Sequence, residues 1–443
     1  MFDFDMLGLQ PALNAALAHN GFKEPTPIQN KAIPLAMEGH DILGLAQTGT
    51  GKTLAFGLPL IDHLLANPAK PAPKTAKSLI LAPTRELVNQ IADGLRKLTL
   101  NTNVHIITVV GGQSINRQIG ALHRGCDILV ATPGRLIDLM DRGSVNLSTV
   151  KHLVLDEADQ MLDLGFIHAL RKIAPKLGTP RQTMLFSATM PKQMEELSRA
   201  YLTNPQRVQV SPPGKAADKV SQSVHFMDKA AKPRKLRDLL TNDLGALTLV
   251  FCRTKHGAEK LKNGLEKDGF SAASIHGNKS QGQRDRAIKG FRDGTTTILV
   301  ATDVAARGID IPGVSYVINY DLPEVPDSYV HRIGRTARAG LEGQAIAFCS
   351  AEEVDLLTQI ERLMKIDIPV VSGDRPAAVS APKSRRGNGG GGGGNGARGG
   401  RPGGGGNGGQ NRSRGPKPAF GAAPANGKPG AKPRRRKPAR QGA

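Results

Sequence analysis

Short apolar runs alternate with amphipathic stretches through the first half of the chain. The runs are rich in Val, Ile and Leu, which is typical of strands, and they lie at residues 41–46, 78–83, 105–110, 127–132, 152–156 and 182–187. Because they are almost continuously apolar, we expect both faces of each strand to be buried, as in a parallel sheet covered by helices. Ligands of such sheets bind at the carboxyl ends of the strands. The pattern predicts an α/β domain over residues 1–210.

A second series of strands follows a break in this pattern. The segment 211–220 begins with Ser211-Pro212-Pro213-Gly214 and lacks apolar periodicity, which indicates an interdomain linker. Strand patterns then lie at residues 223–227, 247–251, 273–276, 297–301, 316–320 and 344–349, with helical patterns such as 255–267 and 285–292 between them. The sequence predicts a second α/β domain over residues 221–372, and a length of 443 residues suits two domains and a tail.

The charge of the chain is concentrated at its C-terminal end. The formal net charge is +22, yet 45 of the 60 basic residues and all 38 acids precede Lys383. From residue 383 onward, 21 of 61 residues are glycine, so no core is expected to form there. We expect residues 373–443 to be a disordered basic Gly/Arg-rich arm that binds RNA. A solubilising tail and an anionic membrane as partner are the alternatives.

The cysteines and the apolar segments indicate the cellular environment of the protein. Cys126, Cys252 and Cys349 are odd in number and widely spaced, so they suggest neither a zinc site nor a disulfide framework. The N-terminus lacks a basic segment followed by an apolar run, and no stretch approaches 18 uninterrupted apolar residues. These features favour a cytoplasmic protein that does not associate with membranes.

A candidate phosphate loop runs from Ala46 to Thr53. It follows a predicted strand and precedes an apolar helical pattern at residues 54–65, as a Walker A loop requires. Its glycines let backbone N–H groups face phosphate oxygens, Lys52 offers a charge to the β- and γ-phosphates, and Thr53 offers a hydroxyl to Mg²⁺. A generic glycine turn stays open, because alanine replaces the usual first glycine. The candidate ATP-binding residues here are Ala46, Gln47, Thr48, Gly49, Thr50, Gly51, Lys52 and Thr53.

A candidate Walker B site closes the apolar strand at residues 152–156. Asp156 would hold Mg²⁺ through its water shell, and Glu157 would orient and deprotonate the attacking water. Two adjacent acids are more often a helix cap or a solvated turn. Their position at the end of a buried strand, in a chain that already has the lysine loop, favours the magnesium site.

The phosphate loop and the Asp156-Glu157 pair belong to a longer series of motifs along the chain. Asp156-Glu157-Ala158-Asp159, and a phosphate loop that begins with alanine, resemble the DEAD-box ATP-dependent RNA helicases. Other segments resemble the remaining motifs of that family, in the family's order: Phe4 with 21–29, 83–87, 111–112, 132–135 and 187–189, and then 250–253, 281–284, 301–310 and 331–338. The resemblance covers about residues 2–370 and implies two tandem RecA-like domains.

The resemblance also implies roles in ATP binding and hydrolysis. Gln29 would read the adenine edge, Phe4 would pack on the base, and Phe22, Gly308 and Asp310 would complete the ATP site. Arg335 and Arg338 would join Lys52, Asp156 and Glu157 in catalysis and would arrive from the second domain. The residues implied on the ribose side of ATP or in coupling the domains are Ser187, Thr189, Asp303, His331 and Arg332.

An RNA track shared by both domains is implied in the same way. Most of its residues are small, amide-bearing or cationic, which suits phosphate and 2′-OH contacts rather than base edges. They are Pro83, Thr84, Arg85, Gly112, Thr132, Pro133, Gly134 and Arg135 in the first domain, and Arg253, Gly277, Gln281, Arg284 and Thr302 in the second. We therefore expect RNA binding with low sequence specificity.

The implied function is RNA-stimulated ATP hydrolysis, with ATP and Mg²⁺, that drives local and non-processive unwinding or remodelling of RNA duplexes and RNA–protein complexes. An ATP-gated RNA clamp or annealing factor with little unwinding, and ATP-driven work on DNA, are the alternatives. The Gly/Arg tail resembles the bacterial RhlE-type branch, for which ribosomal precursors or an RNA-decay complex are candidate partners of a monomeric core. Ala337 departs from the family, which usually has glycine there, and we expect its methyl group to be tolerated with some loss of rate.

Overall fold

The structure is a computed structural model that describes residues 3–47, 49–210, 220–242, 245–309, 311, 313–337 and 342–376. Residues 1–381 form one compact unit, and it contains two α/β domains. Most of the expected linker, and the expected tail from residue 377 onward, lie outside the described residues.

The first domain is built on a parallel sheet with the strand order β3-β4-β2-β5-β6-β1-β7. Its strands are β1 Ile42–Leu45, β2 Ala76–Leu81, β3 Ile106–Val109, β4 Cys126–Ala131, β5 His152–Leu155, β6 Gln182–Ser187 and β7 Gln206–Gln209. The six predicted strands are confirmed. The pattern missed β7, because this edge strand is short and polar and buries little besides Val208.

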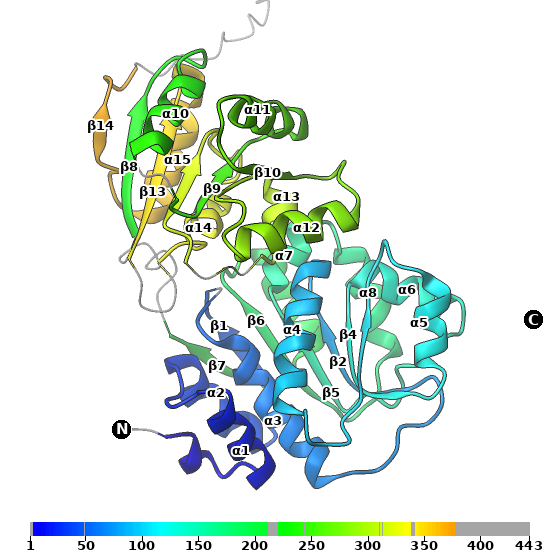
Figure 1. The fold of residues 1–443 in the computed structure, drawn as a ribbon. Helices are drawn as coiled ribbons and strands as arrows, with labels where there is room; N and C mark the ends of the chain where they lie inside the picture. Colours follow the sequence, from blue (N-terminus) through cyan, green and yellow to red (C-terminus); the bar gives the residue numbers. More distant parts are fainter. Residues whose placement is uncertain are drawn as a thin grey trace, which may run out of the picture. The chain divides into compact units, whose positions relative to one another are not determined.

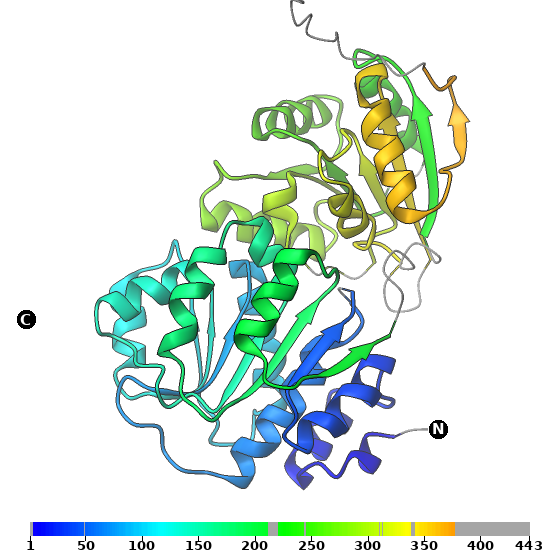
Figure 2. The ribbon, with the colours of Figure 1, turned by 180° about the vertical axis from the view of Figure 1, so that it is seen from behind.

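Helices cover both faces of this sheet, as the two opposite views show (Figures 1 and 2). Successive strand residues point to opposite faces, so Ile42 packs in a core with α1 to α4 while Leu43 packs in a core with α6 to α9. The helices are α1 Pro11–His19, α2 Pro27–Met37, α3 Lys52–Ala66, α4 Arg85–Leu98, α5 Ile115–Leu122, α6 Pro133–Asp141, α7 Ala158–Asp163, α8 Ile167–Ile173 and α9 Lys192–Tyr201. The expectation of strands buried on both faces is confirmed.

The second domain repeats this plan with the strand order β10-β11-β9-β12-β13-β8-β14, again in parallel. Its strands are β8 Val220–Phe226, β9 Thr248–Phe251, β10 Ala272–Ile275, β11 Ile298–Ala301, β12 Tyr316–Asn319, β13 Gly343–Cys349 and β14 Val370–Ser372. Strand β8 begins at Val220, inside the expected linker, because it pairs with β13 along its whole length. The exposed strand β14 was not predicted.

Helices also flank the second sheet (Figure 1): α10 Lys232–Asn242, α11 Lys255–Lys267, α12 Gln281–Arg292, α13 Asp303–Ala306, α14 Pro326–Ile333 and α15 Val354–Met364. Helix α12 begins four residues before the predicted start, because Ser280 and Gln283 form a capping box there. None of the helices in the described ranges combines the length and apolarity needed to cross a membrane.

Candidate functional site

The predicted site residues of the first domain lie at the carboxyl ends of its strands. The phosphate loop follows β1, Asp156 follows β5, and Ser187 ends β6, and these three strands are neighbours in the sheet. Thr84, Gly112 and Thr132 follow β2, β3 and β4, which are neighbours in the other half. The sheet order therefore separates the predicted nucleotide residues from the predicted RNA residues along one edge.

The phosphate loop has the backbone conformation that phosphate binding needs. Gly49 and Gly51 have φ angles of 84° and 91°, in the left-handed region that favours glycine. A Cβ atom on Gly51 would lie 2.4 Å from Nε2 of Gln29, so a side chain has no room there. Thr50 donates a hydrogen bond to the carbonyl of Gln47 (2.7 Å) and ties the loop to itself. Thr48 lies outside the described residues.

Lys52 and Asp156 face each other beneath this loop. Lys52 is 6 % exposed, and its Nζ lies 3.7 Å from Oδ1 of Asp156 without a hydrogen bond to any described residue. Burial raises the pKa of Asp156 to about 6, with Lys52 opposing this shift and Glu157 adding to it. The structure thus brings the predicted loop lysine and the predicted magnesium ligand together.

Glu157 sits at the N-terminus of α7 in a strained conformation. Its φ and ψ angles are 52° and 50°, in a region that costs a non-glycine residue roughly 1–2 kcal/mol. The residue is 2 % exposed. Strain of this kind persists where the surrounding structure holds a side chain in one direction. This observation supports a specific role for the carboxylate rather than a solvated turn.

Asp159 connects the strand ends to the segment after β6. Its Oδ2 accepts hydrogen bonds from the backbone N–H groups of Ala188 (3.0 Å) and Thr189 (2.9 Å) and from the Thr189 hydroxyl (3.1 Å). The Ser187 hydroxyl donates to the Thr189 carbonyl (2.6 Å). Nε2 of His331 lies 3.9 Å from the same Asp159 oxygen. The sequence analysis gave Asp159 no role of its own, although it is the fourth residue of the Asp156-Glu157-Ala158-Asp159 motif.

The predicted adenine-binding residues occupy two different environments. Gln29 accepts a hydrogen bond from the Thr26 backbone N–H (2.9 Å) and donates one to the Gly51 carbonyl (2.9 Å), so it links α2 to the phosphate loop. Phe4 is 3 % exposed and packs in the core, whereas Phe22 is 42 % exposed. Phe4 is thus packed among apolar side chains of the first domain, and its packing on the base stays a prediction. Phe22 is the accessible ring of the two.

The predicted RNA residues of the first domain are held by caps and turns. Thr84 caps α4 by accepting a hydrogen bond from the Leu87 N–H (3.2 Å), and Thr132 with Pro133 begins α6. Arg135 donates to the Gln113 carbonyl (3.1 Å) next to Gly112. Pro83 is buried, whereas Gly112 and Gly134 are exposed. Burial lowers the pKa of Arg85 from its ordinary value.

The predicted RNA residues of the second domain also follow strand ends. Arg253 follows β9, Gly277 follows β10 and Thr302 follows β11, while Gln281 and Arg284 lie in the first turn of α12. Arg85 donates to Oε1 of Gln281 (3.0 Å). These contacts join residues that the sequence assigned to one RNA track.

Two acids that sequence reasoning left out make further contacts with the second domain. Oε1 of Glu86 accepts a hydrogen bond from Gln281 (3.1 Å) and lies 3.2 Å from Nη2 of Arg284. Oδ2 of Asp163 lies 3.1 Å from Nη2 of Arg307. Each acid lies inside or near a quoted motif, but the sequence does not indicate its partner, which is more than 100 residues away. The only sequence signal for these contacts was an acidic residue in or near a motif of the first domain and basic residues in motifs of the second domain.

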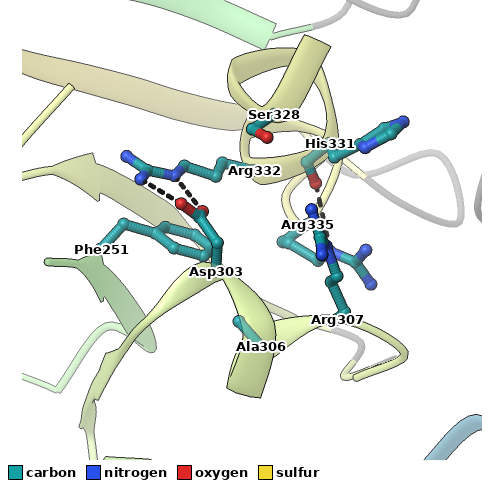
Figure 3. Close-up of a pocket in the computed structure, with 8 residues that line it drawn as sticks. All are labelled: Phe251, Asp303, Ala306, Arg307, Ser328, His331, Arg332 and Arg335. Atoms are coloured by element: carbon teal, nitrogen blue, oxygen red, sulfur yellow. Dashed lines mark hydrogen bonds and ion pairs between the residues drawn. The ribbon is translucent and has the colours of Figure 1, made fainter. Parts of the chain in front are cut away.

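A small pocket in the second domain gathers the residues of the last two motifs (Figure 3). Arg332 binds Asp303 through two hydrogen bonds (2.5 and 2.7 Å), donates to Asn319 (3.0 Å), and lies over the Phe251 ring at 4.9 Å. Arg335 donates to the carbonyls of Ile309 (2.7 Å) and His331 (3.2 Å). Arg332 and Asp303 thus form an ion pair inside this domain.

The remaining predicted residues of these motifs are placed differently. A Cβ atom on Gly308 would lie 2.1 Å from Oγ1 of Thr84. The backbone of Gly308 therefore approaches Thr84, a predicted RNA-binding residue, rather than the phosphate loop. Asp310 and Arg338 lie outside the described residues.

Ala337 adopts the conformation for which glycine is suited. Its φ angle is 54°, and it follows Thr336, whose hydroxyl binds the Val314 carbonyl. We expect Ala337→Gly to raise the free energy of unfolding by about 0.5–1 kcal/mol, because relief of the left-handed conformation outweighs the added freedom of the unfolded chain. Thermal unfolding of the full chain measures this. Ala287→Gly, within helix α12, is the control and should be destabilising by about 1 kcal/mol. A lower melting temperature for Ala337→Gly would contradict the expectation.

Two protein families match the chain in succession. The DEAD/DEAH box helicase family matches residues 26–197, and the helicase conserved C-terminal domain matches residues 231–340. The first match contains the phosphate loop, Asp156 and Thr189, and the second contains the residues of the pocket in Figure 3.

Solved structures are similar over most of the chain. Dbp5 of S. cerevisiae, bound to RNA and ADP BeF3, is 32% identical, with 84% of this chain and 95% of that chain covered and a TM-score of 0.76. Mss116p bound to ssRNA and AMP-PNP is 29% identical, with 84% and 80% covered and a TM-score of 0.76. A DEAD box protein from the hyperthermophile Methanococcus jannaschii is 40% identical, with 84% and 99% covered and a TM-score of 0.50.

Proposed function

The chain belongs to the DEAD-box family of ATP-dependent RNA helicases, and from this premise we propose that ATP hydrolysis uses its phosphate loop together with arginines of its second domain. The buried ammonium group of Lys52 is the observation that carries the proposal. It lies 3.7 Å from Asp156 and makes no hydrogen bond to a described residue. Because a buried cation without hydrogen-bond acceptors is costly, the β- and γ-phosphate oxygens of ATP are its natural partners.

Mg²⁺ fits the residues beside Lys52. The Thr53 hydroxyl and the Asp156 carboxylate, partly through water, would hold it, and oxygen atoms are the ligands that Mg²⁺ prefers. When bound, it would neutralise negative charge on the phosphoryl group being transferred. In the described parts of the chain, no three His, Cys, Asp or Glu side chains are grouped to hold a metal, so phosphate and water oxygens would complete its shell.

The carboxylate of Glu157 would act on the attacking water. It would accept a hydrogen bond from the water, orient the lone pair toward the γ-phosphorus, and take the proton as the new P–O bond forms and the bond between the γ-phosphorus and the β–γ bridging oxygen breaks, which releases ADP. Lys52 holds the phosphate chain, and Arg335 with Arg338 would stabilise the charge that builds up on the γ-phosphate oxygens. Gln29 would bind the adenine edge, and the exposed ring of Phe22 would pack on the base.

Asp159 would link the hydrolysis site to the second domain. It holds the Ser187-Ala188-Thr189 segment by three hydrogen bonds and lies 3.9 Å from His331. The ion pair of buried Arg332 and half-buried Asp303 would hold α14 in place, so that His331 and Arg335 project from one rigid helix end. A shift of the RNA-binding residues would then change the position of Thr189.

RNA would bind along the Thr84, Gly112 and Thr132 loops and across to Arg253, Gly277, Gln281, Arg284 and Thr302. Small and cationic groups at strand ends suit phosphate and 2′-OH contacts, so we expect weak sequence preference. A track that fits only a bent single strand would shift a short duplex toward separated strands.

The finer assignments are proposals of the same kind. We propose domain boundaries at residues 1–210, 211–220, 221–372 and 373–443, and the ends of β7 at Gln209 and of β14 at Ser372 support the first and last of them. The basic Gly/Arg-rich tail would bind RNA, and its composition supports a relation to the bacterial RhlE-type branch. We propose a monomeric core in the cytoplasm that acts on ribosomal precursors or within an RNA-decay complex.

Steady-state ATP turnover with RNA, with DNA and without nucleic acid tests the proposed function. We expect RNA to raise turnover by at least tenfold and DNA to have little effect, because the track recognises 2′-OH groups. A short RNA duplex should separate when ATP is present. Turnover that RNA leaves unchanged would contradict the proposal, and stimulation without strand separation would favour an ATP-gated clamp.

A further inference from the structure

The carboxylate of Glu353 joins four segments at the carboxyl edge of the second sheet. Glu353 ends the short 3₁₀ helix Ala351–Glu353 after β13 and is 2 % exposed. Its Oε2 accepts hydrogen bonds from the backbone N–H (3.1 Å) and the hydroxyl (2.9 Å) of Ser350. Its Oε1 accepts from the Leu322 N–H (3.1 Å), which follows β12, and from Nη2 of Arg253 (2.9 Å), which follows β9.

Lys232 at the start of α10 completes this cluster. It is 1 % exposed, and its Nζ donates to Oε2 of Glu353 (2.6 Å) and to the Tyr320 carbonyl (2.8 Å). It also lies 3.7 Å from Oδ1 of Asp321. Burial by itself would raise the pKa of Glu353, but Lys232 and Ser350 hold this pKa below its ordinary value. Glu353 is therefore ionised at neutral pH.

Arg253 is the residue through which this cluster reaches solvent. Its side chain is 37 % exposed, whereas those of Glu353 and Lys232 are 2 % exposed. Nη2 donates to Glu353 and to the Leu322 carbonyl (3.3 Å), and the Arg253 backbone N–H donates to Oδ2 of Asp321 (2.9 Å). Within the described residues, the hydrogen bonds of the guanidinium all use Nη2. Glu353 and the Leu322 carbonyl thus hold the guanidinium at its Nη2 atom.

We propose that Glu353, held by Lys232, is a positioning residue that orients Arg253 toward the RNA backbone. The proposal rests on the proposed function, in which Arg253 belongs to the RNA track. A free arginine side chain loses rotamer freedom when it is fixed on a phosphate. Because Glu353 already fixes the guanidinium, less of this cost falls on RNA binding. Within the described residues, Glu353 makes no hydrogen bond to a predicted nucleotide residue, and Arg332 meets the cluster at the Asp321 carbonyl (2.7 Å), so the effect should fall mainly on RNA affinity.

The first test uses Glu353→Gln in the full chain and measures RNA-stimulated ATP turnover against RNA concentration. We expect the KM for RNA to rise about five- to tenfold while kcat at saturating RNA stays within about twofold. Glu352→Gln is the matched control, because this neighbouring acid is exposed and pairs with Lys229 alone among the described residues. It should leave both constants unchanged. A normal KM for a folded Glu353→Gln protein would overturn the proposal.

A buried lysine without its partner is destabilising, so Glu353→Gln needs two companions. Lys232→Met with Glu353→Gln removes both buried charges and should show the same raised KM. Arg253→Lys leaves the buried pair intact and keeps the exposed charge but loses the planar fork, and it should raise the KM about three- to fivefold. Arg253→Lys with an unchanged KM would show that orientation is irrelevant and would overturn the proposal even if the other variants fail to fold.

A double-mutant cycle separates positioning from a general structural role. In an Arg253→Ala background, Glu353→Gln should produce no further rise in the KM for RNA, because its effect passes through Arg253. An equal rise in both backgrounds would overturn the proposal. The failure of the proposed function is recognised separately: in that case Arg253→Ala itself leaves the KM unchanged, or the unmodified chain shows no stimulation by RNA.

Discussion

Glu157→Gln should lower the maximal rate of ATP hydrolysis by about 10²- to 10⁴-fold while ATP and RNA still bind. A positioned general base contributes a factor of this size, and glutamine keeps the shape of glutamate but cannot accept the proton of the attacking water. Single-turnover hydrolysis with saturating RNA measures the chemical step, and equilibrium titrations measure the two affinities.

The geometry explains why the loss should fall on the rate rather than on binding. Lys52 and Asp156, which would hold the phosphates and Mg²⁺, lie 3.7 Å apart and are unchanged by the substitution. Glu157 also raises the pKa of Asp156, so removing its charge should favour the ionised, metal-binding form of Asp156. ATP binding is therefore expected to be equal or somewhat tighter.

Two further measurements keep this prediction specific. Glu196→Gln removes a charge from an exposed acid of helix α9 and should leave the rate unchanged. The strained backbone at Glu157 is retained by both glutamate and glutamine, so the melting temperature should stay close to that of the unmodified chain. Hydrolysis by Glu157→Gln at more than a tenth of the normal rate would exclude Glu157 as the general base.

Apolar periodicity predicted the fold well, because the strands are buried on both faces. The pattern located six strands in each sheet, including the edge strands β3 and β10, and in the first domain the strand residues alternate between two cores. It missed β7, in which Gln206, Arg207 and Gln209 carry no apolar signal, and β14, whose three residues are all exposed. The sequence also placed the start of β8 too late, since Ser221 and Gln222 look like linker until their pairing with β13 is known.

The candidate site was predictable where a motif is contiguous and less so where partners are distant. The phosphate loop and Asp156 meet as expected, because they follow β1 and β5, which are separated in the sheet by β6 and end at the same edge. The burial of Phe4 and the pairing of Asp303 with Arg332 depend on tertiary packing that no local spacing encodes. Glu353 is the clearest case, since its partners lie 31 to 121 residues away in sequence. Nothing in the local segment at 350–353 indicates an arginine beside it.

The second large effect is expected at Arg335. Arg335→Ala should lower kcat for ATP hydrolysis by about 10³-fold or more, because an arginine that reaches the γ-phosphate stabilises charge that appears only in the transition state. In the structure, its guanidinium donates to the His331 carbonyl at the end of α14 (Figure 3) and to the Ile309 carbonyl. The KM for ATP should change little, because Lys52 and the phosphate loop lie in the other domain.

Arg335 is 4 % exposed, so its loss also removes packing in the second domain, and the variants must separate this effect from catalysis. Arg335→Lys keeps the charge but loses the planar fork that matches a phosphate, and it should recover only a small part of the rate. Arg292→Ala removes an equal charge from the exposed end of α12 and should leave kcat unchanged. If Arg335→Ala is folded, binds RNA with normal affinity and hydrolyses ATP at an ordinary rate, then hydrolysis does not draw on the second domain through this residue. A rate loss that scales with the unfolded fraction would give Arg335 a packing role alone. A loss in fully folded protein would instead support a hydrolysis site completed by both domains.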